Sequence, residues 1–172
     1  MNLFLIDALG PFFSDRGQKT INWSKIAFSD LDPTSPAGHR QFQVIRARFV
    51  TYIRSIRELG FNAISLDDVV HITDHPWYDE DLRSRIARFA EEFHTLFAIA
   101  ADHNIQVFVN LDILSMTPAL RSRLGRHDDQ MRHFVTVLLE RLFNEFPTVA
   151  GVVFRIGESD GGDVRDDFFS EL

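Results

Sequence analysis

Four apolar segments of this 172-residue chain each end in an acidic residue that is followed by a polar loop. They end at Leu5-Ile6-Asp7, Ser65-Leu66-Asp67-Asp68, Asn110-Leu111-Asp112 and Arg155-Ile156-Gly157-Glu158. Amphipathic, helix-like segments separate them, so the strands are predicted to be parallel, with their carboxyl ends at one rim. Enzymes of the α/β class place their chemistry at that rim. Four acids from four strands therefore predict an enzyme that handles polar, hydroxyl-rich or cationic groups.

The best candidate for a catalytic group is Glu158, three residues after Arg155 at the end of the fourth segment. A carboxyl group that is protonated near neutral pH can deliver its proton to a leaving oxygen. We predict that Glu158 is a general acid/base, that Arg155 orients or tunes the carboxylates, and that Asp160 contacts the substrate. The alternative is a loop acid that caps the next helix or lies in solvent.

Strand-end residues of the other segments are predicted to bind the substrate. They are Asp7, Asp67, Asp68, Asn110 and Asp112. Strict alternation puts Ser65 and Asp67 on one face and Leu66 and Asp68 on the other, so one of the two acids should point into the site. It also puts Asn110 and Asp112 on the same face as Phe108. Other roles stay open, because an acid after the second strand can cap a turn and Asp7 can pair with an arginine such as Arg155.

Aromatic residues and histidines of the predicted loops complete the candidate site. Trp23, Trp77 and Tyr78 can stack on a substrate or anchor their loops, and Trp23 is assigned to substrate binding. His71 and His75 have a spacing that could hold a metal on a helix. Pro76 favours a loop, so we predict no metal site and assign His71 to the substrate.

The apolar periodicity predicts one α/β domain over residues 1–172. Strands are expected at 3–9, 61–66, 105–111 and 150–156, helices at 40–59, 81–103 and 127–145, and a long loop at 11–38. Gly60 is predicted to end the first helix as its C′ residue.

Chain length bears on the architecture. A closed (β/α)8 barrel takes about 250 residues and at least about 200. The order β-α-β-α-β-α-β in 172 residues therefore predicts half of a TIM barrel, with sheet order 1-2-3-4. The alternative, a doubly wound domain with order 2-1-3-4, is disfavoured because no glycine-rich phosphate loop follows the first strand.

Composition narrows the classes of function. The net charge of −7 disfavours general nucleic-acid binding. With no cysteine, a disulfide framework and a cysteine nucleophile are excluded. No apolar run approaches the ~20 residues of a membrane span, and the N-terminus lacks the features of a signal peptide. We expect a cytoplasmic protein without membrane or nucleic-acid partners.

The four strands together resemble the N-terminal half of a (β/α)8-barrel glycoside hydrolase catalytic domain, loosely of the α-glucuronidase type. The resemblance rests on Asp7, on Leu59-Gly-Phe-Asn-Ala-Ile-Ser-Leu-Asp-Asp68, on Asn110-Leu-Asp112 and on Gly157-Glu158. It implies a carbohydrate substrate, no cofactor, an acid/base at Glu158 and a second carboxylate on a later strand. The largest clan of these enzymes has Asn-Glu where this chain has Gly-Glu.

Two other interpretations stay open. Strand-end carboxylates could instead bind Mg²⁺ for enolate or phosphoryl chemistry. Alternatively, the chain is an inactive half-barrel that self-associates through open sheet edges and an apolar face that carries Phe108 and Phe154 or its neighbours. In that case we expect the isolated chain not to be a well-behaved monomer and to lack glycosidase activity.

Overall fold

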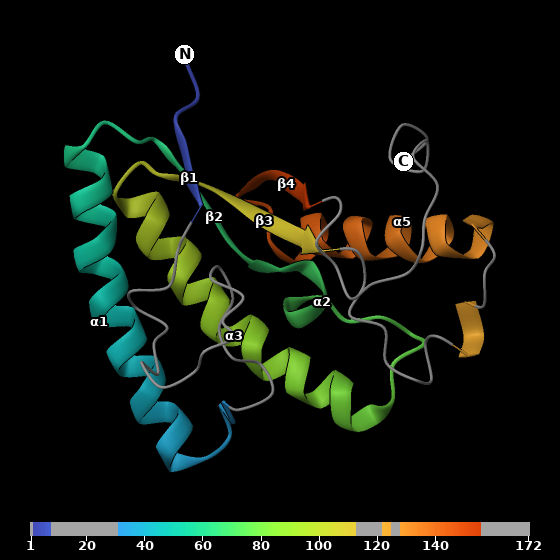
Figure 1. Cartoon of the computed structure of the whole chain (residues 1–172). Helices are drawn as coiled ribbons and strands as arrows, with labels where there is room; N and C mark the ends of the chain where they lie inside the picture. Colours follow the sequence, from blue (N-terminus) through green and yellow to red (C-terminus); the bar gives the residue numbers. More distant parts are fainter. Residues whose placement is uncertain (1, 8–30, 113–121, 125–127, 156–172) are drawn as a thin grey trace.

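The computed structural model describes residues 2–7, 31–112, 122–124 and 128–155, with the backbone alone at 67, 68, 112, 128 and 155. Its parallel sheet consists of β1 (Leu5–Asp7), β2 (Ala63–Asp68), β3 (Gln106–Asp112) and β4 (Val149–Arg155). These strands lie in the order β1-β2-β3-β4 (Figure 1). This confirms the sequential order, and the 2-1-3-4 order of a doubly wound sheet is excluded for the described strands.

Three long helices alternate with the strands. They are α1 (Pro36–Glu58), α3 (Glu80–Asp102) and α5 (Asp128–Glu145), and a short helix, α2 (Val69–Ile72), follows β2 directly. α1 begins before the predicted position because Ser35 caps it, with Oγ accepting a hydrogen bond from the Gly38 N–H at 3.0 Å, and Pro36 occupies the first turn.

Two helices end in the same hydrogen-bonded motif. After α1, Gly60 has a φ of 93°, its N–H donates to the Arg57 carbonyl, and the Phe61 N–H donates to the Ile56 carbonyl. After α3, Asn104 takes the same place with a φ of 55°. Both are Schellman motifs, in which a left-handed residue satisfies the last carbonyls of a helix. The prediction of Gly60 as a C′ residue is confirmed.

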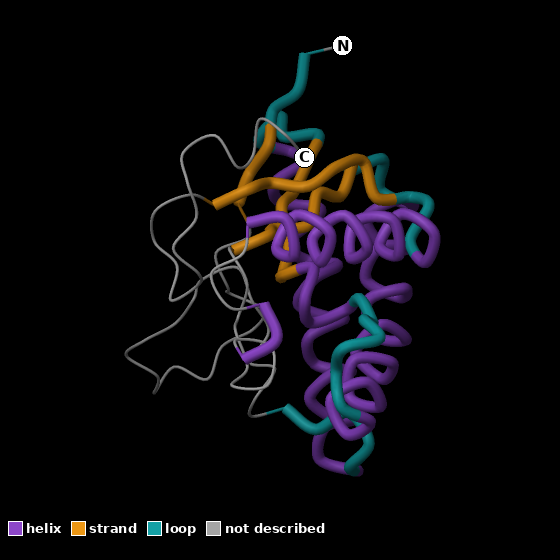
Figure 2. The backbone as a smooth tube through the Cα atoms, turned by 90° about the vertical axis from the view of Figure 1, so that its right-hand side faces the viewer, coloured by secondary structure: helices purple, strands orange, loops and turns teal. Residues whose placement is uncertain are grey.

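One face of the sheet is buried under the helices. Alternate residues of β3, namely Val107, Val109 and Leu111, join the core cluster with the apolar stripes of the helices. Phe89, Phe93 and the other buried residues of α3 belong to that layer. The helices lie together on one side of the strands (Figure 2).

The other face of the sheet carries a different set of residues. The register aligns Asp7 with Ser65, Ser65 with Phe108, and Phe108 with Gly151, while Asn110 lies opposite Val153. Phe108 and Val153 are outside the core cluster, which confirms Phe108 on this face, but Phe154 packs against the core. The prediction named Phe154 or its neighbours, and it is the neighbour Val153 that lies on this face, because alternation along β4 turns Phe154 toward the helices.

The short helix α2 packs between the long helices α3 and α5. It contacts both α3 and α5 and buries Val69, Val70 and Ile72. It lies between the two long helices in the outer layer (Figure 1). The sequence analysis did not predict this helix, and the groove described below depends on it.

Within the described ranges, no helix is both long enough and apolar enough to cross a membrane.

Gly38 provides a test of the α1 N-terminus. A Cβ atom at this position would lie 1.7 Å from the Asp32 carbonyl oxygen. Gly→Ala in a helix normally stabilises by about 1 kcal/mol, but here we expect Gly38→Ala to lower the free energy of unfolding by about 2 kcal/mol or more. Urea unfolding measures the change, with the neighbouring Ala37→Gly as the propensity control. A stabilised Gly38→Ala protein would contradict the packing.

Candidate active site

Asp7 and Ser65 form a hydrogen-bonded pair at the carboxyl end of β1. Ser65 Oγ donates to Asp7 Oδ1 at 2.5 Å, and the two residues are register partners on adjacent strands. Ser65 is fully buried and Asp7 is half-buried. Burial, and then the charge of Asp7, raise the pKa of the Tyr52 phenol on α1. Asp7 is thus held in a fixed position at the rim, which fits either substrate contact or a structural role.

Asn110 is the polar side chain on β3 that is buried at the same rim. Its exposed fraction is 0%, and neither Oδ1 nor Nδ2 has a hydrogen-bond partner among the described residues. A buried amide without partners costs about 1–3 kcal/mol. Buried polar groups are as a rule hydrogen-bonded, and a ligand at the carboxyl end of the strand is one source of the bonds that this amide lacks among the described residues.

An irregularity in β2 changes which acid aligns with Asn110. The register shifts between Leu66 and Asp68, so that Asp68 rather than Asp67 is the partner of Asn110. Such a bulge inserts one residue and breaks the strict alternation. The prediction that alternation puts Ser65 and Asp67 on one face concerns the side chain of Asp67, which lies outside the described residues, so it stays a prediction.

Asp112 and Arg155 are register partners on β3 and β4. The backbone thus brings one acid and the arginine to neighbouring positions at the rim. Their side chains, and those of Asp67 and Asp68, lie outside the described residues, so their roles stay predictions.

Three further predicted residues, Glu158, Asp160 and Trp23, also lie outside the described residues. Their assignment to catalysis or substrate binding stays a prediction from the sequence. What the structure brings together at the rim is the Asp7–Ser65 pair, Asn110 and the strand ends at Asp68, Asp112 and Arg155.

The two histidines after β2 have different environments. His71 is half-buried on α2, whereas His75 lies in the loop before α3 and is 2% exposed. His75 Nδ1 accepts a hydrogen bond from the backbone N–H of Trp77 at 3.1 Å. Burial first, and then the charge of Arg141, lower the pKa of His75 to about 4. His75 is therefore a neutral core residue near pH 7, and no step of chemistry is assigned to it.

Trp77 and Tyr78 pack around His75 and Phe134. The rings of Trp77 and Phe134 stack with centroids 5.8 Å apart, and the Arg123 guanidinium lies 5.6 Å from the centre of the indole. These contacts take up ring surface that a sugar would need, so they favour the loop-anchoring role over the stacking role.

A metal centre finds no support in the described side chains. No group of three or more histidine, aspartate or glutamate residues among them could hold an ion. The magnesium interpretation depends on the side chains of Asp67, Asp68 and Asp112, which lie outside that set, and it stays open on this ground.

Ser65 is the site residue that sequence reasoning missed. Alternation placed it on the same face as an acid of its own strand, but its partner is Asp7 on the neighbouring strand. The sequence does hold a signal for the pairing of Ser65 with Asp7, because both residues lie near the ends of neighbouring strands.

Comparison with known proteins supports the fold. No protein-family model and no curated protein matches the sequence. Among solved structures, the chain is similar to a GH138 enzyme targeting pectin rhamnogalacturonan II, with a TM-score of 0.57 and 15% sequence identity. The match covers 90% of this chain but 18% of the length of that enzyme. At this identity the likeness concerns the fold, which is an α/β arrangement also found within a glycoside hydrolase.

The pKa of His75 predicts how stability depends on pH. The folded protein takes up this proton only near pH 4, whereas an unfolded histidine takes it up near pH 6.5. This contribution is therefore complete above about pH 6.5 and is lost as the pH falls toward 4. The loss is on the order of 3 kcal/mol.

The measurement is urea unfolding at several pH values. His75→Asn keeps an acceptor for the Trp77 N–H but does not titrate, so we expect a smaller loss of stability between pH 6.5 and 4. The exposed His39→Asn is the matched control. Equal pH dependence in wild type and His75→Asn would show that His75 is not the group responsible.

Proposed function

We propose that the chain forms the first four β/α units of a (β/α)8 glycoside hydrolase and that the carboxyl rim of its strands binds a carbohydrate. The observation that carries the proposal is Asn110, a fully buried amide without hydrogen-bond partners among the described residues, at a strand end where such enzymes bind substrate. The sequential parallel order of the strands and the likeness to the GH138 enzyme support the architecture.

Each rim residue has a role in this proposal. Asn110 donates to one sugar hydroxyl and accepts from another, because an amide offers both functions. Asp7, held by Ser65, accepts from a further hydroxyl. Asp67, Asp68 and Asp112 are further residues that bind sugar hydroxyls. The positive charge of Arg155 offsets part of the negative charge of these carboxylates.

We assign Glu158 as the general acid/base of the hydrolytic step. Its carboxyl proton passes to the leaving glycosidic oxygen as the bond to the anomeric carbon breaks. Protonation near neutral pH requires a raised pKa, for which neighbouring carboxylates are a physical cause. In barrel glycoside hydrolases of the type that this chain resembles, a second carboxylate lies on a later strand. We therefore expect this chain alone to bind a glycan but not to hydrolyse it.

Substitution of Asn110 tests the binding site. We expect the chain to bind one or more members of a glycan panel that includes pectic oligosaccharides. Asn110→Leu, of similar shape, should weaken that binding about tenfold or more, because a good hydrogen bond contributes about 1–1.5 kcal/mol. It should leave the thermal midpoint unchanged or higher, because it removes an unsatisfied buried amide.

Glycan arrays and calorimetry measure the binding, with the exposed Asn144→Leu on α5 as the matched control. Equal affinity of Asn110→Leu and wild type for a bound glycan would contradict the site. So would a wild-type chain that binds no glycan in the panel.

Self-association tests the half-barrel. Edge strands expose unpaired backbone groups, so we expect light scattering to report species heavier than the 19.8 kDa monomer. Chromogenic glycosides should show no turnover. A stable monomer with turnover that Glu158→Gln abolishes would refute the half-barrel, although it would support the role given to Glu158.

A further inference from the structure

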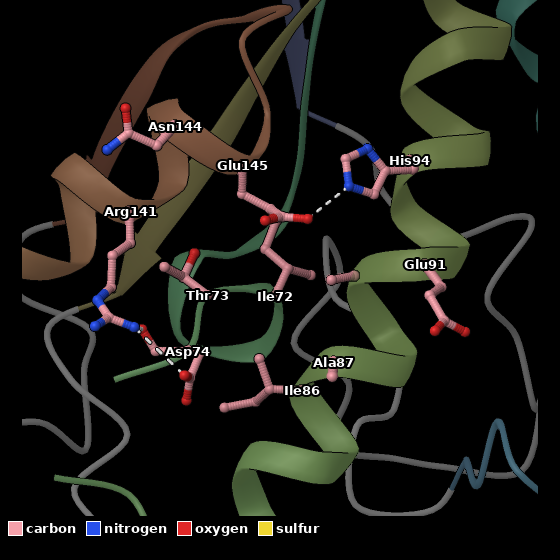
Figure 3. A pocket seen from close by; sticks show the side chains of 11 residues that line it. Ile72, Thr73, Asp74, Ile86, Ala87, Glu91, His94, Arg141, Asn144 and Glu145 are labelled. Atoms are coloured by element: carbon pink, nitrogen blue, oxygen red, sulfur yellow. Dashed lines mark hydrogen bonds and ion pairs between the residues drawn. The ribbon is translucent and has the colours of Figure 1, made fainter. Parts of the chain in front are cut away.

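A groove opens in the outer layer of helices, between α3 and α5. It has a volume of about 520 Å³, within the range of small-molecule sites. Its apolar lining includes Ile72, Ile86 and Ala90, all buried. α2 holds the two long helices apart at this point, because it contacts both of them (Figure 3). No role in the proposed glycosidase chemistry involves this groove.

Two polar bridges border the groove. At one end, Glu145 on α5 lies 2.8 Å from His94 Nε2 on α3. At the other end, Arg141 on α5 lies 3.3 Å from Asp74, which also accepts two hydrogen bonds of 2.9 Å from Arg83. Both bridges are visible around the groove in Figure 3.

The two ends carry opposite charge. Two arginines share the single carboxylate of Asp74, and the hydrogen bond from Arg83 is the first of the causes that lower the pKa of that carboxyl. This leaves an excess of positive charge near Arg141. At the other end, Glu145 has a histidine as its partner, and Glu91, which also lines the groove, pairs with Arg88 of its own helix at 3.2 Å. The lining is therefore positive at one end and negative at the other.

The charged residues of α5 that border the groove lie about one turn apart. Arg141 and Glu145 are four residues apart, so their Cα atoms are separated by a rise of about 6 Å along the axis, on the same face of the helix. Residues of opposite charge at this spacing commonly pair with each other, but here each pairs with a different element, on either side of the groove.

One buried polar group faces no partner. Thr73 lines the groove, is 2% exposed, and its Oγ1 has no hydrogen-bond partner among the described residues. Thr73 lies beside Arg141 at the positive end (Figure 3). A hydroxyl next to a guanidinium is suited to a ligand carboxylate, to which both can donate.

We propose that this groove binds a zwitterion whose carboxylate and ammonium are about one helical turn apart, joined by an apolar body. The carboxylate accepts from Arg141 and Thr73, the ammonium donates to Glu145, and the body lies over Ile72 and Ile86. Short dipeptides and ω-amino acids have this form, whereas the charges of a single α-amino acid are too close together.

Matched probes test the proposal on the whole chain by calorimetry at low salt. 6-Aminohexanoate carries both charges, whereas hexanoate and hexylammonium each lack one. We expect 6-aminohexanoate to bind about tenfold or more tightly than either of the others, because each charge-assisted hydrogen bond adds more than 1 kcal/mol. Alanyl-leucine distinguishes a dipeptide site from an ω-amino acid site, since the true class should bind more tightly.

Variants locate the binding. Ala87→Leu places a larger side chain in the groove from an exposed helix position and should reduce affinity about tenfold. The same change at Ala47, exposed on α1, is the control. Thr73→Val removes the hydroxyl at nearly constant shape and should weaken 6-aminohexanoate and hexanoate but not hexylammonium. Equal affinities for the three probes, no binding of 6-aminohexanoate, or equal effects of Ala87→Leu and Ala47→Leu would overturn the proposal.

Discussion

The structure depends on the burial of one face of a parallel sheet under helices. Successive residues of a strand point to opposite faces, so the commitment of Val107, Val109 and Leu111 to the core fixes the other residues of β3 on the opposite face. Phe108 and Asn110 are there as a consequence. The register then aligns this row with Ser65 and Asp7 on the neighbouring strands. The polar rim is thus a consequence of how the core is packed.

Features that depend on residues close together in the sequence could be predicted, whereas features that depend on contacts between distant segments could not. The strands and the end of α1 at Gly60 were predictable because apolar periodicity and a helix-ending glycine are local signals. The strand order was predicted from the chain length and from the lack of a glycine-rich loop after the first strand. The start of α1 at Pro36 was missed because apolar spacing begins only at Phe42, whereas the signal there is the Ser35 cap. Local capping chemistry thus extended a helix beyond its core-facing stripe.

Other features could not be predicted, because contacts between distant segments decide them. The shift in β2 that aligns Asp68 with Asn110 exists only in the paired sheet. α2 contains Val69, Val70 and Ile72, whose β-branched side chains favour strands, and their burial between α3 and α5 outweighs that preference. The hydrogen bond from Ser65 to Asp7 spans 58 positions of sequence, so no pattern within one segment identifies it.

α2 also connects the two candidate sites. β2 ends at Asp68, α2 begins at Val69, and the residues that follow it, Thr73 and Asp74, line the groove. The rim and the groove are therefore separated by a single helical turn whose apolar side chains are fixed in the core. Any coupling between the two sites would have to be equal in both directions, and it would act through the packing of Val69, Val70 and Ile72.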